Sequence, residues 1–199
     1  MITFESQFSP TVNSFKAQIA EDIRVLDFRP DTVADFGCGD GRTTLALSIL
    51  LHPARLTGID NDQNVINAAN TQLSTLKPRL TELNIPLPIF IVGDVVTGQD
   101  LPSEVEFGYS RRLLGNVWGP FCENLAAAQQ VLQKAICNIS RSLSSKGWLI
   151  MVEESAQHND YTKYLEEAGL FVQEKTTFTY SGTVLPMTRY VCRKQPTAK

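Results

Sequence analysis

The ten-residue stretch VADFGCGDGR at positions 33–42 constrains the fold of this chain more than any other feature. A short apolar run with one acid meets three glycines at alternate positions, and an apolar-periodic segment follows. This pattern is typical of a buried strand, a tight loop and the first turn of a helix. The glycines allow a sharp turn and close approach to a ligand, because no side chain is in the way. A helix that begins near Arg42 points its first amide groups at whatever occupies the loop. The stretch therefore predicts either a ligand loop or a tight turn of an ordinary α/β protein.

The spacing of the glycines narrows the choice of ligand. A dinucleotide fingerprint needs a glycine where Arg42 stands, and no Gly-Lys-Ser/Thr follows, which excludes a P-loop. An acid two residues before the first glycine, then GCGDG, resembles the first motif of the class I S-adenosylmethionine-dependent methyltransferases, which have a Rossmann-like fold. The resemblance covers nearly the whole chain, from Asp35 onward. It implies S-adenosyl-L-methionine as cofactor, with Asp35, Gly37, Cys38 and Gly39 among the residues that bind it.

A second acid follows at the expected distance. A strand predicted at 55–60 ends in Asp60, which comes about twenty residues after Gly39, the separation at which an acid meets ribose hydroxyls in nucleotide-binding βαβ units. A carboxylate suits this role because it accepts from two hydroxyls at once. We therefore assign Asp60, with the neighbouring Asn61, to the cofactor. The alternative for Asp60 is a turn residue at the end of a strand.

The next two predicted strands supply three more candidates. Asp94 and Val95 follow a strand at 86–92, and by the resemblance they contact the amino group and a ring nitrogen of the adenine. A Gly-Asp pair after a strand is also a common turn. Ser110 ends a strand at 105–110, and the resemblance places it beside the methionine part of the cofactor.

The chain also departs from the family. Gly108 stands where many relatives carry an acid, and there is no Asp/Asn-Pro-Pro-Tyr/Phe, the signature of amino-group methylation on bases and some proteins. Glu153, Glu154 and His158 follow the predicted fifth strand, where a general base would be useful if the acceptor must lose a proton. Their alternative is a solvated, helix-capping loop. No catalytic residue is assigned.

Strands alternate with helices and a hairpin closes the chain, which predicts a three-layer α/β/α sandwich. We expect a mostly parallel seven-stranded sheet whose last strand is antiparallel, and the resemblance places that strand between the fifth and the sixth. We expect one domain over 1–199, with an N-terminal helical segment at 1–30. Further predictions are a loop at 115–120, a helix at 125–143, a strand at 148–152, and β-rich runs at 170–180 and 184–193.

Composition narrows the possible partners. Of the 199 residues, 43% are apolar and 20% are charged. The net charge of −3 lacks the excess of positive charge that is typical of proteins that bind a nucleic-acid backbone. Four scattered cysteines without a Cys-x-x-Cys pair favour reduced thiols over a disulfide frame or a metal site. No signal peptide or membrane-spanning run is evident. We therefore expect a cytoplasmic protein without metal, membrane or nucleic-acid partners, and we predict nothing about its oligomeric state.

The resemblance implies methyl transfer from a sulfonium, which requires in-line alignment of a nucleophile. We expect a small-molecule acceptor beneath loops that carry Trp118 and Tyr180, although both aromatics could simply pack against helices. Other possibilities are a non-catalytic cofactor-binding module or partner subunit, or a methyltransferase that acts on protein or nucleic acid. A nicotinamide-dependent oxidoreductase is disfavoured by Arg42.

Overall fold

Seven strands form one sheet in the computed structural model, which describes residues 10–118, 124–155, 160–180 and 186–195. The strands are β1 (Thr32–Phe36), β2 (Arg55–Asp60), β3 (Ile89–Val92), β4 (Val105–Arg111), β5 (Leu143–Glu154), β6 (Leu170–Phe178) and β7 (Met187–Lys194). Their order across the sheet is β3-β2-β1-β4-β5-β7-β6, and β7 is antiparallel to both of its neighbours. The predicted sheet is confirmed, including the place of the last strand between the fifth and the sixth.

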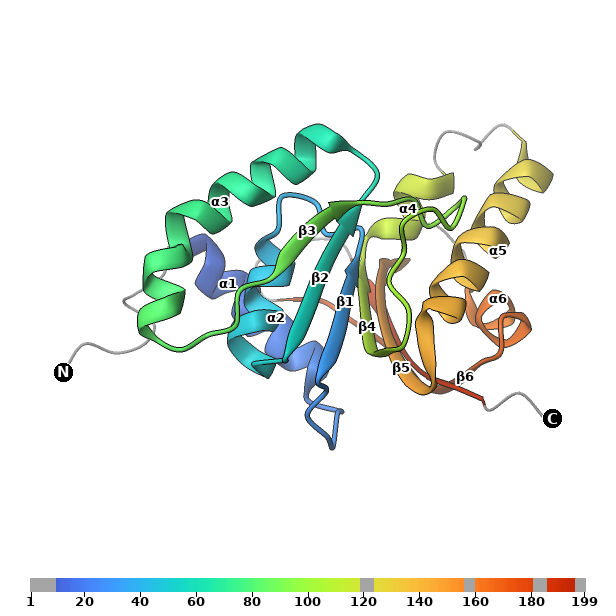
Figure 1. Ribbon diagram of the computed structural model, residues 1–199. Helices are drawn as coiled ribbons and strands as arrows, with labels where there is room; N and C mark the ends of the chain where they lie inside the picture. Colours follow the sequence, from blue (N-terminus) through green and yellow to red (C-terminus); the bar gives the residue numbers. More distant parts are fainter. Residues whose placement is uncertain (1–9, 119–123, 156–159, 181–185, 196–199) are drawn as a thin grey trace.

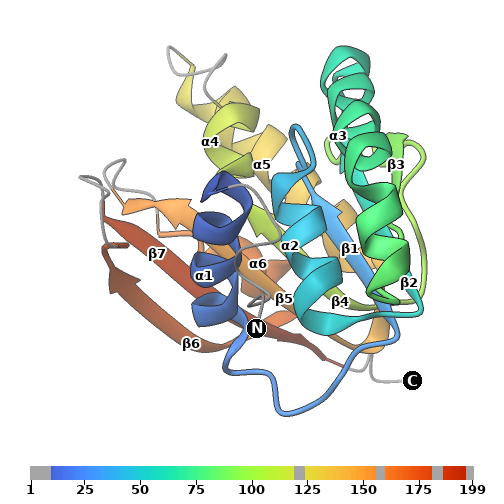
Figure 2. The same ribbon diagram turned by 90° about the vertical axis from the view of Figure 1, so that its left-hand side faces the viewer.

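Helices cover both faces of this sheet (Figures 1 and 2). One layer holds α1 (Pro10–Ile23), α2 (Arg42–Leu51) and α3 (Gln63–Glu82), and the other holds α4 (Leu113–Trp118), α5 (Leu125–Ser142) and α6 (Thr162–Glu167). The predicted three-layer α/β/α architecture is therefore confirmed. The start of α3 follows from its sequence, since the Asp62 side chain accepts a hydrogen bond from the backbone N–H of Asn64 and caps the helix.

Side-chain alternation along the central strands decides which residues reach which layer. Val33 of β1 packs in the cluster shared with α1 and α2, whereas Ala34 and Phe36 pack in the cluster shared with α5 and α6. In β4, Phe107 and Tyr109 face the α1 side. The strands are buried on both faces, as parallel strands between two helix layers must be.

Several of the predicted boundaries differ from the structure, among them the strand predicted at 86–92, which begins at Ile89. The predicted loop at 115–120 is helical through Trp118, because α4 is capped by a distant side chain that local sequence does not reveal; residues 119 and 120 lie outside the described part of the chain. The helix predicted at 125–143 ends at Ser142, and β5 begins at Leu143 instead of Trp148. Leu143 pairs with Val105 of β4. This pairing places Leu143 in a strand, although the helical spacing of apolar residues extends to it.

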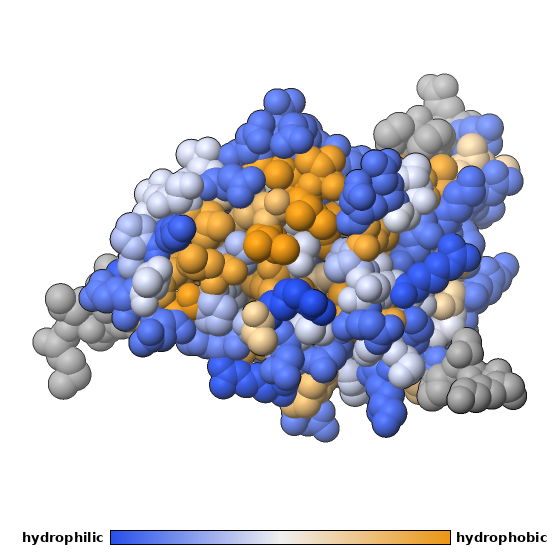
Figure 3. Space-filling model, in the orientation of Figure 1, coloured by the Kyte–Doolittle hydropathy of each residue, from blue (hydrophilic) through white to orange (hydrophobic). Residues whose placement is uncertain are grey.

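The surface of this fold has one apolar area on the face shown in Figure 3, over the edge strand β3, where Leu87, Ile89 and Val92 are exposed. Among the helices of the described residues, none combines the length and the apolar character that crossing a membrane requires. Cys38, Cys137 and Cys192 are free thiols. The fourth cysteine, Cys122, lies outside the described ranges.

Candidate cofactor and acceptor site

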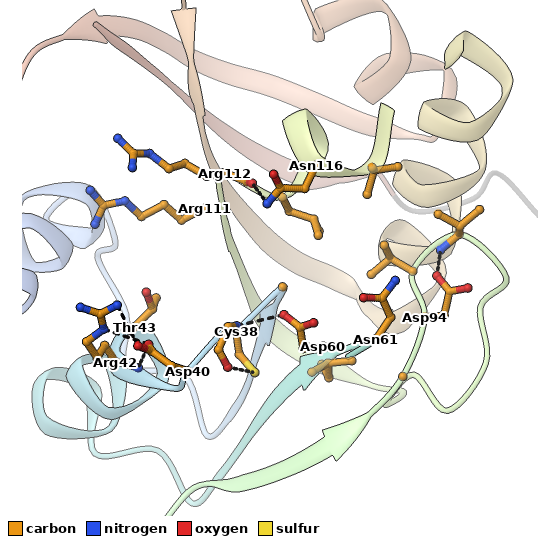
Figure 4. Close-up of a pocket in the computed structure, with 18 of the residues that line it drawn as sticks. Cys38, Asp40, Arg42, Thr43, Asp60, Asn61, Asp94, Arg111, Arg112 and Asn116 are labelled. Atoms are coloured by element: carbon orange, nitrogen blue, oxygen red, sulfur yellow. Dashed lines mark hydrogen bonds and ion pairs between the residues drawn. The ribbon is translucent and has the colours of Figure 1, made fainter. Parts of the chain in front are cut away.

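A pocket of about 880 Å³ lies at the edge of the sheet where β1, β2 and β4 end (Figure 4). Its wall comes from the glycine loop after β1, the end of β2, the loop after β3, the end of β4 with α4, and Phe15 of α1. In an open parallel sheet this carboxyl edge, beside the change in strand order, is where ligands bind. The pocket brings together seven of the predicted cofactor residues: Gly37, Cys38, Gly39, Asp60, Asn61, Asp94 and Val95.

The glycine loop has the geometry that its sequence predicts. Gly37 and Gly41 have φ angles of 76° and 84°, a region that side chains strongly disfavour. The backbone N–H groups of Gly37 and Cys38 both donate to the carbonyl oxygen of Ile59, at 2.8 and 2.9 Å. A β-carbon on residue 41 would come within 2.7 Å of the Phe90 ring, so the turn into α2 also leaves no room for a side chain.

Asp60 connects the end of β2 to this loop. Its Oδ2 accepts a hydrogen bond from the Gly39 N–H at 3.0 Å, and its Oδ1 accepts from the Asp62 N–H at 3.1 Å. Both contacts fix the carboxylate at the pocket wall, next to Asn61 (Figure 4). The carboxylate keeps further lone pairs for a ligand, since each oxygen accepts more than one hydrogen bond.

The loop after β3 is held from both sides. Asp94 Oδ1 accepts from the Val96 N–H at 2.8 Å, which shapes the turn. The side-chain amide of Asn138, on α5, donates to the carbonyl oxygens of Val95 and Val96, each at 3.0 Å. Asn138 thus positions the predicted adenine contacts from outside the pocket, a role that no local sequence signal indicates.

Two predicted cofactor residues do not line the pocket, and their roles stay predictions. Asp35 is buried beneath α2, where it accepts a hydrogen bond from the Thr44 hydroxyl at 2.6 Å. Burial raises the pKa of Asp35 to about 7. Ser110 is buried too, and its hydroxyl has no hydrogen-bond partner among the described residues. Asp35 and Ser110 are each the last residue but one of their strand, and neither lines the pocket.

Glu153 is not in a solvated loop, as one prediction placed it, although the helix-capping part of that prediction agrees with the structure. It is part of β5, is 2% exposed, and accepts hydrogen bonds from the backbone N–H groups of Leu113 and Leu114 at 3.0 Å and of Gly115 at 3.4 Å. Burial raises the pKa of Glu153 to about 7, although these hydrogen bonds act in the opposite direction. Glu153 therefore caps the start of α4, a helix that lines the pocket.

The neighbouring candidates are placed differently. Glu154 pairs with Arg112 at 3.1 Å, and neither Glu153 nor Glu154 lines the pocket. His158 lies outside the described residues, so its prediction as a base is not addressed. Cys38 lines the pocket, but burial raises the pKa of its thiol, which opposes a nucleophilic role.

Helix α1 contributes to the pocket wall through Phe15. Phe15 lines the pocket, and the guanidinium groups of Arg42 and Arg111 lie 5.0 and 5.3 Å from the centre of its ring. The helical spacing of Phe15 with Ile19 and Ile23 predicts a core-facing side chain but not this contact with two arginines.

A buried carboxylate anchors the other end of α1. Asp22 accepts hydrogen bonds from the hydroxyls of Tyr109 and Tyr180, at 2.7 Å from Tyr109 and at 2.6 and 2.7 Å from Tyr180. Burial raises the pKa of Asp22 despite these donors. Tyr180 thus packs against α1 and does not line the pocket; the Trp118 side chain lies outside what the structure describes.

The sequence pattern of the methyltransferase small domain family matches residues 20–178. This chain belongs to the methyltransferase small domain family. It is an S-adenosylmethionine-dependent methyltransferase, and S-adenosylmethionine is its cofactor, as the glycine motif predicts. The prediction of an enzyme is confirmed, and the non-catalytic alternative is set aside.

Solved structures of methyltransferases share the fold. A methyltransferase from Methanosarcina mazei is 16% identical, with a TM-score of 0.65 over 87% of this chain and 96% of that one. Magnesium protoporphyrin IX methyltransferase from Synechocystis PCC 6803, solved with its bound cofactor, is 14% identical, with a TM-score of 0.65 over 98% and 86%. A third, from Clostridium acetobutylicum, is 12% identical, with a TM-score of 0.66 over 92% of each chain. No curated protein sequence matches this chain significantly.

Proposed function

We propose that this methyltransferase transfers the methyl group of S-adenosylmethionine to a small-molecule acceptor bound in the same pocket. The observation that carries the proposal is the convergence of the glycine loop, Asp60 and Asp94 on one cavity of about 880 Å³. That volume is in the upper part of the range for ligand pockets, about 300–1,000 Å³, so cofactor and a small acceptor fit together.

Within this pocket the cofactor's parts follow the order of the strands. Asp60, at the end of β2, binds the ribose hydroxyls, and Asp94 with the Val95 N–H binds the adenine. The backbone of Gly37 to Gly39 lies beside the methionine part. Each of these residues is fixed by backbone hydrogen bonds to its neighbours, so the site is ordered before a ligand arrives.

The chemistry needs alignment more than acid–base help. The cofactor supplies an electrophilic methyl group on a sulfonium, and the chain's task is to hold the acceptor in line with that group and to exclude water. Phe15, Leu113 and Val117 supply an apolar wall beside the polar groups of Arg111 and Asn116, the mixture that suits a small ligand.

Two measurements test this function. Calorimetric titration with S-adenosylmethionine and with S-adenosylhomocysteine should each give one site. The release of S-adenosylhomocysteine should then be followed with small acids, phenols, thiols and amines, and in parallel with total tRNA and a peptide library. Turnover confined to tRNA or peptides would refute the proposal that the acceptor is a small molecule. The absence of cofactor binding would refute the assignment of this pocket to the cofactor.

A further inference from the structure

The two sides of the pocket differ in charge. Asp60 and Asp94 lie at the side that we assign to adenosine, whereas Arg111 and Arg112 extend on the opposite side, from the end of β4 (Figure 4). Arg42 lines the pocket as well, and its guanidinium pairs with Asp40 at 2.7 Å. The side away from adenosine is therefore rich in guanidinium groups.

Arg111 differs from the other two arginines in its partners. Arg42 pairs with Asp40, and Arg112 pairs with Glu154, whereas Arg111 makes no ion pair with a carboxylate of the residues that the structure describes. Its Nη2 donates to the Gln18 side-chain oxygen at 2.5 Å. Its Nη1 is buried and has no hydrogen-bond partner within the described part of the chain. A buried charged donor without a partner is costly, so this nitrogen favours an anionic ligand.

The guanidinium group of Arg111 is also held in place. Its carbon Cζ lies 4.7 Å from the centre of the Tyr180 ring and 5.3 Å from that of Phe15, and Gln18 restrains one edge. The ring of Tyr180 is itself fixed, because its hydroxyl donates to the buried Asp22. A planar guanidinium held in this way matches the two oxygens of a carboxylate better than a flexible ammonium would.

We propose that Arg111 binds a ligand carboxylate in this pocket, and that this carboxylate belongs to the methyl acceptor, which is therefore an organic acid. The inference rests on the proposed function and names the class of its substrate. Because Nη1 is enclosed, binding includes a small movement of the Arg111 or Phe15 side chain. S-adenosylmethionine carries a carboxylate as well, so the test must separate the two sources.

The first arm of the test uses the full chain saturated with S-adenosylhomocysteine. Acetate, hexanoate, benzoate and phenylacetate are titrated beside their carboxamides, with the melting temperature and the heat of binding as readouts. At least one acid should bind while its amide does not. Arg111→Gln should lower the affinity for that acid by at least about tenfold. Arg111→Lys should lower this affinity less than Arg111→Gln does. Arg55→Gln is the control, because it removes an equal charge at the end of β2 that is far from Asp60 and the pocket. It should leave binding of the acid unchanged.

The second arm compares S-adenosylhomocysteine with 5′-methylthioadenosine, which lacks the amino-acid carboxylate. Arg111→Gln should change the two affinities by similar, small factors. A selective loss of S-adenosylhomocysteine binding would assign Arg111 to the cofactor and overturn the proposal, as would acids that bind no better than their amides. Unaltered 5′-methylthioadenosine binding shows that the variant is folded. Failure of S-adenosylhomocysteine to bind the unsubstituted protein would instead refute the proposed function.

Discussion

The side chain of Leu113 fills the space beside the α-carbon of Gly37, where a β-carbon would come within 2.7 Å of Leu113 Cδ1. The glycine loop and α4 are therefore in direct contact at the pocket wall. Glu153 caps α4 at the same residue, because it accepts a hydrogen bond from the Leu113 N–H. The position of the loop thus depends on a carboxylate in β5.

Gly37→Ala should destabilise the protein by roughly 1–3 kcal/mol and weaken S-adenosylmethionine binding, since it adds both a strained φ and a steric clash. Gly115→Ala is the matched control, because a β-carbon there meets no atom within 4 Å and the residue is helical. It should stabilise the protein by up to about 1 kcal/mol. Denaturant titration and calorimetry measure both effects, and equal stabilities of the two variants would contradict the packing argument.

Asp60→Asn should weaken binding of S-adenosylmethionine by about 1.5–3 kcal/mol, at least about tenfold in Kd, because a charge-assisted acceptor is lost. Asp62→Ala, two residues away, removes only the cap of α3 and should cost about 1 kcal/mol of stability. Its cofactor affinity should match that of the unsubstituted protein. If Asp60→Asn binds the cofactor normally, the ribose assignment is wrong.

Glu153 should make stability depend on pH. Burial raises the pKa of Glu153 to about 7, above its ordinary value of 4.5. Between these pH values the folded protein holds a proton that the unfolded chain has released, so the free energy of unfolding falls as pH rises through this window. Over this window, the linkage lowers the free energy of unfolding by about 3 kcal/mol.

Replacing the carboxylate tests this linkage. Glu153→Gln should be relatively more stable at pH 8 than at pH 5 when compared with the unsubstituted protein, as measured by urea unfolding at both pH values. Asp35→Asn should act in the same direction, because burial raises the pKa of Asp35 as well, to about 7. Parallel pH profiles for all three proteins would disprove the linkage.

Removing either hydroxyl that donates to Asp22 should loosen α1. Tyr109→Phe and Tyr180→Phe should each cost about 1.5–3 kcal/mol of stability, since each removes a hydrogen bond to a buried carboxylate. The double variant should be non-additive, because both bonds share one acceptor. Tyr164→Phe is the control and should have a smaller effect, because Tyr164 is only partly buried against the core on the other face of the sheet.

Local sequence was enough to predict seven of the residues that line the pocket. Gly37 to Gly39 and Asp94 follow predicted strands, and Asp60 ends one. Parallel strands bring their carboxyl ends to one edge of the sheet. Their spacing along the chain carries the information, so no knowledge of distant contacts is needed.

The parts that sequence did not predict depend on contacts between distant residues. The first backbone N–H groups of α4 donate to the carboxylate of Glu153, some forty residues away. Local sequence does not show this cap, so the glycine and asparagine of α4 predict a loop. Asp35 matches the motif, but alternation along β1 turns its carboxylate toward Thr44. The stacking of Arg111 on Phe15 joins β4 to α1 and has no local signature.

The position of β7 between β5 and β6 has a consequence for synthesis on the ribosome. Residues 170–178 emerge before residues 187–194, yet β6 pairs with β7 and has no other neighbour among the described strands. Until β7 emerges, β5 also presents an open edge, because its second partner is missing. The nascent chain therefore carries unpaired, β-rich segments that can pair with other chains. A chain stalled just before residue 187 would be the species most prone to aggregate.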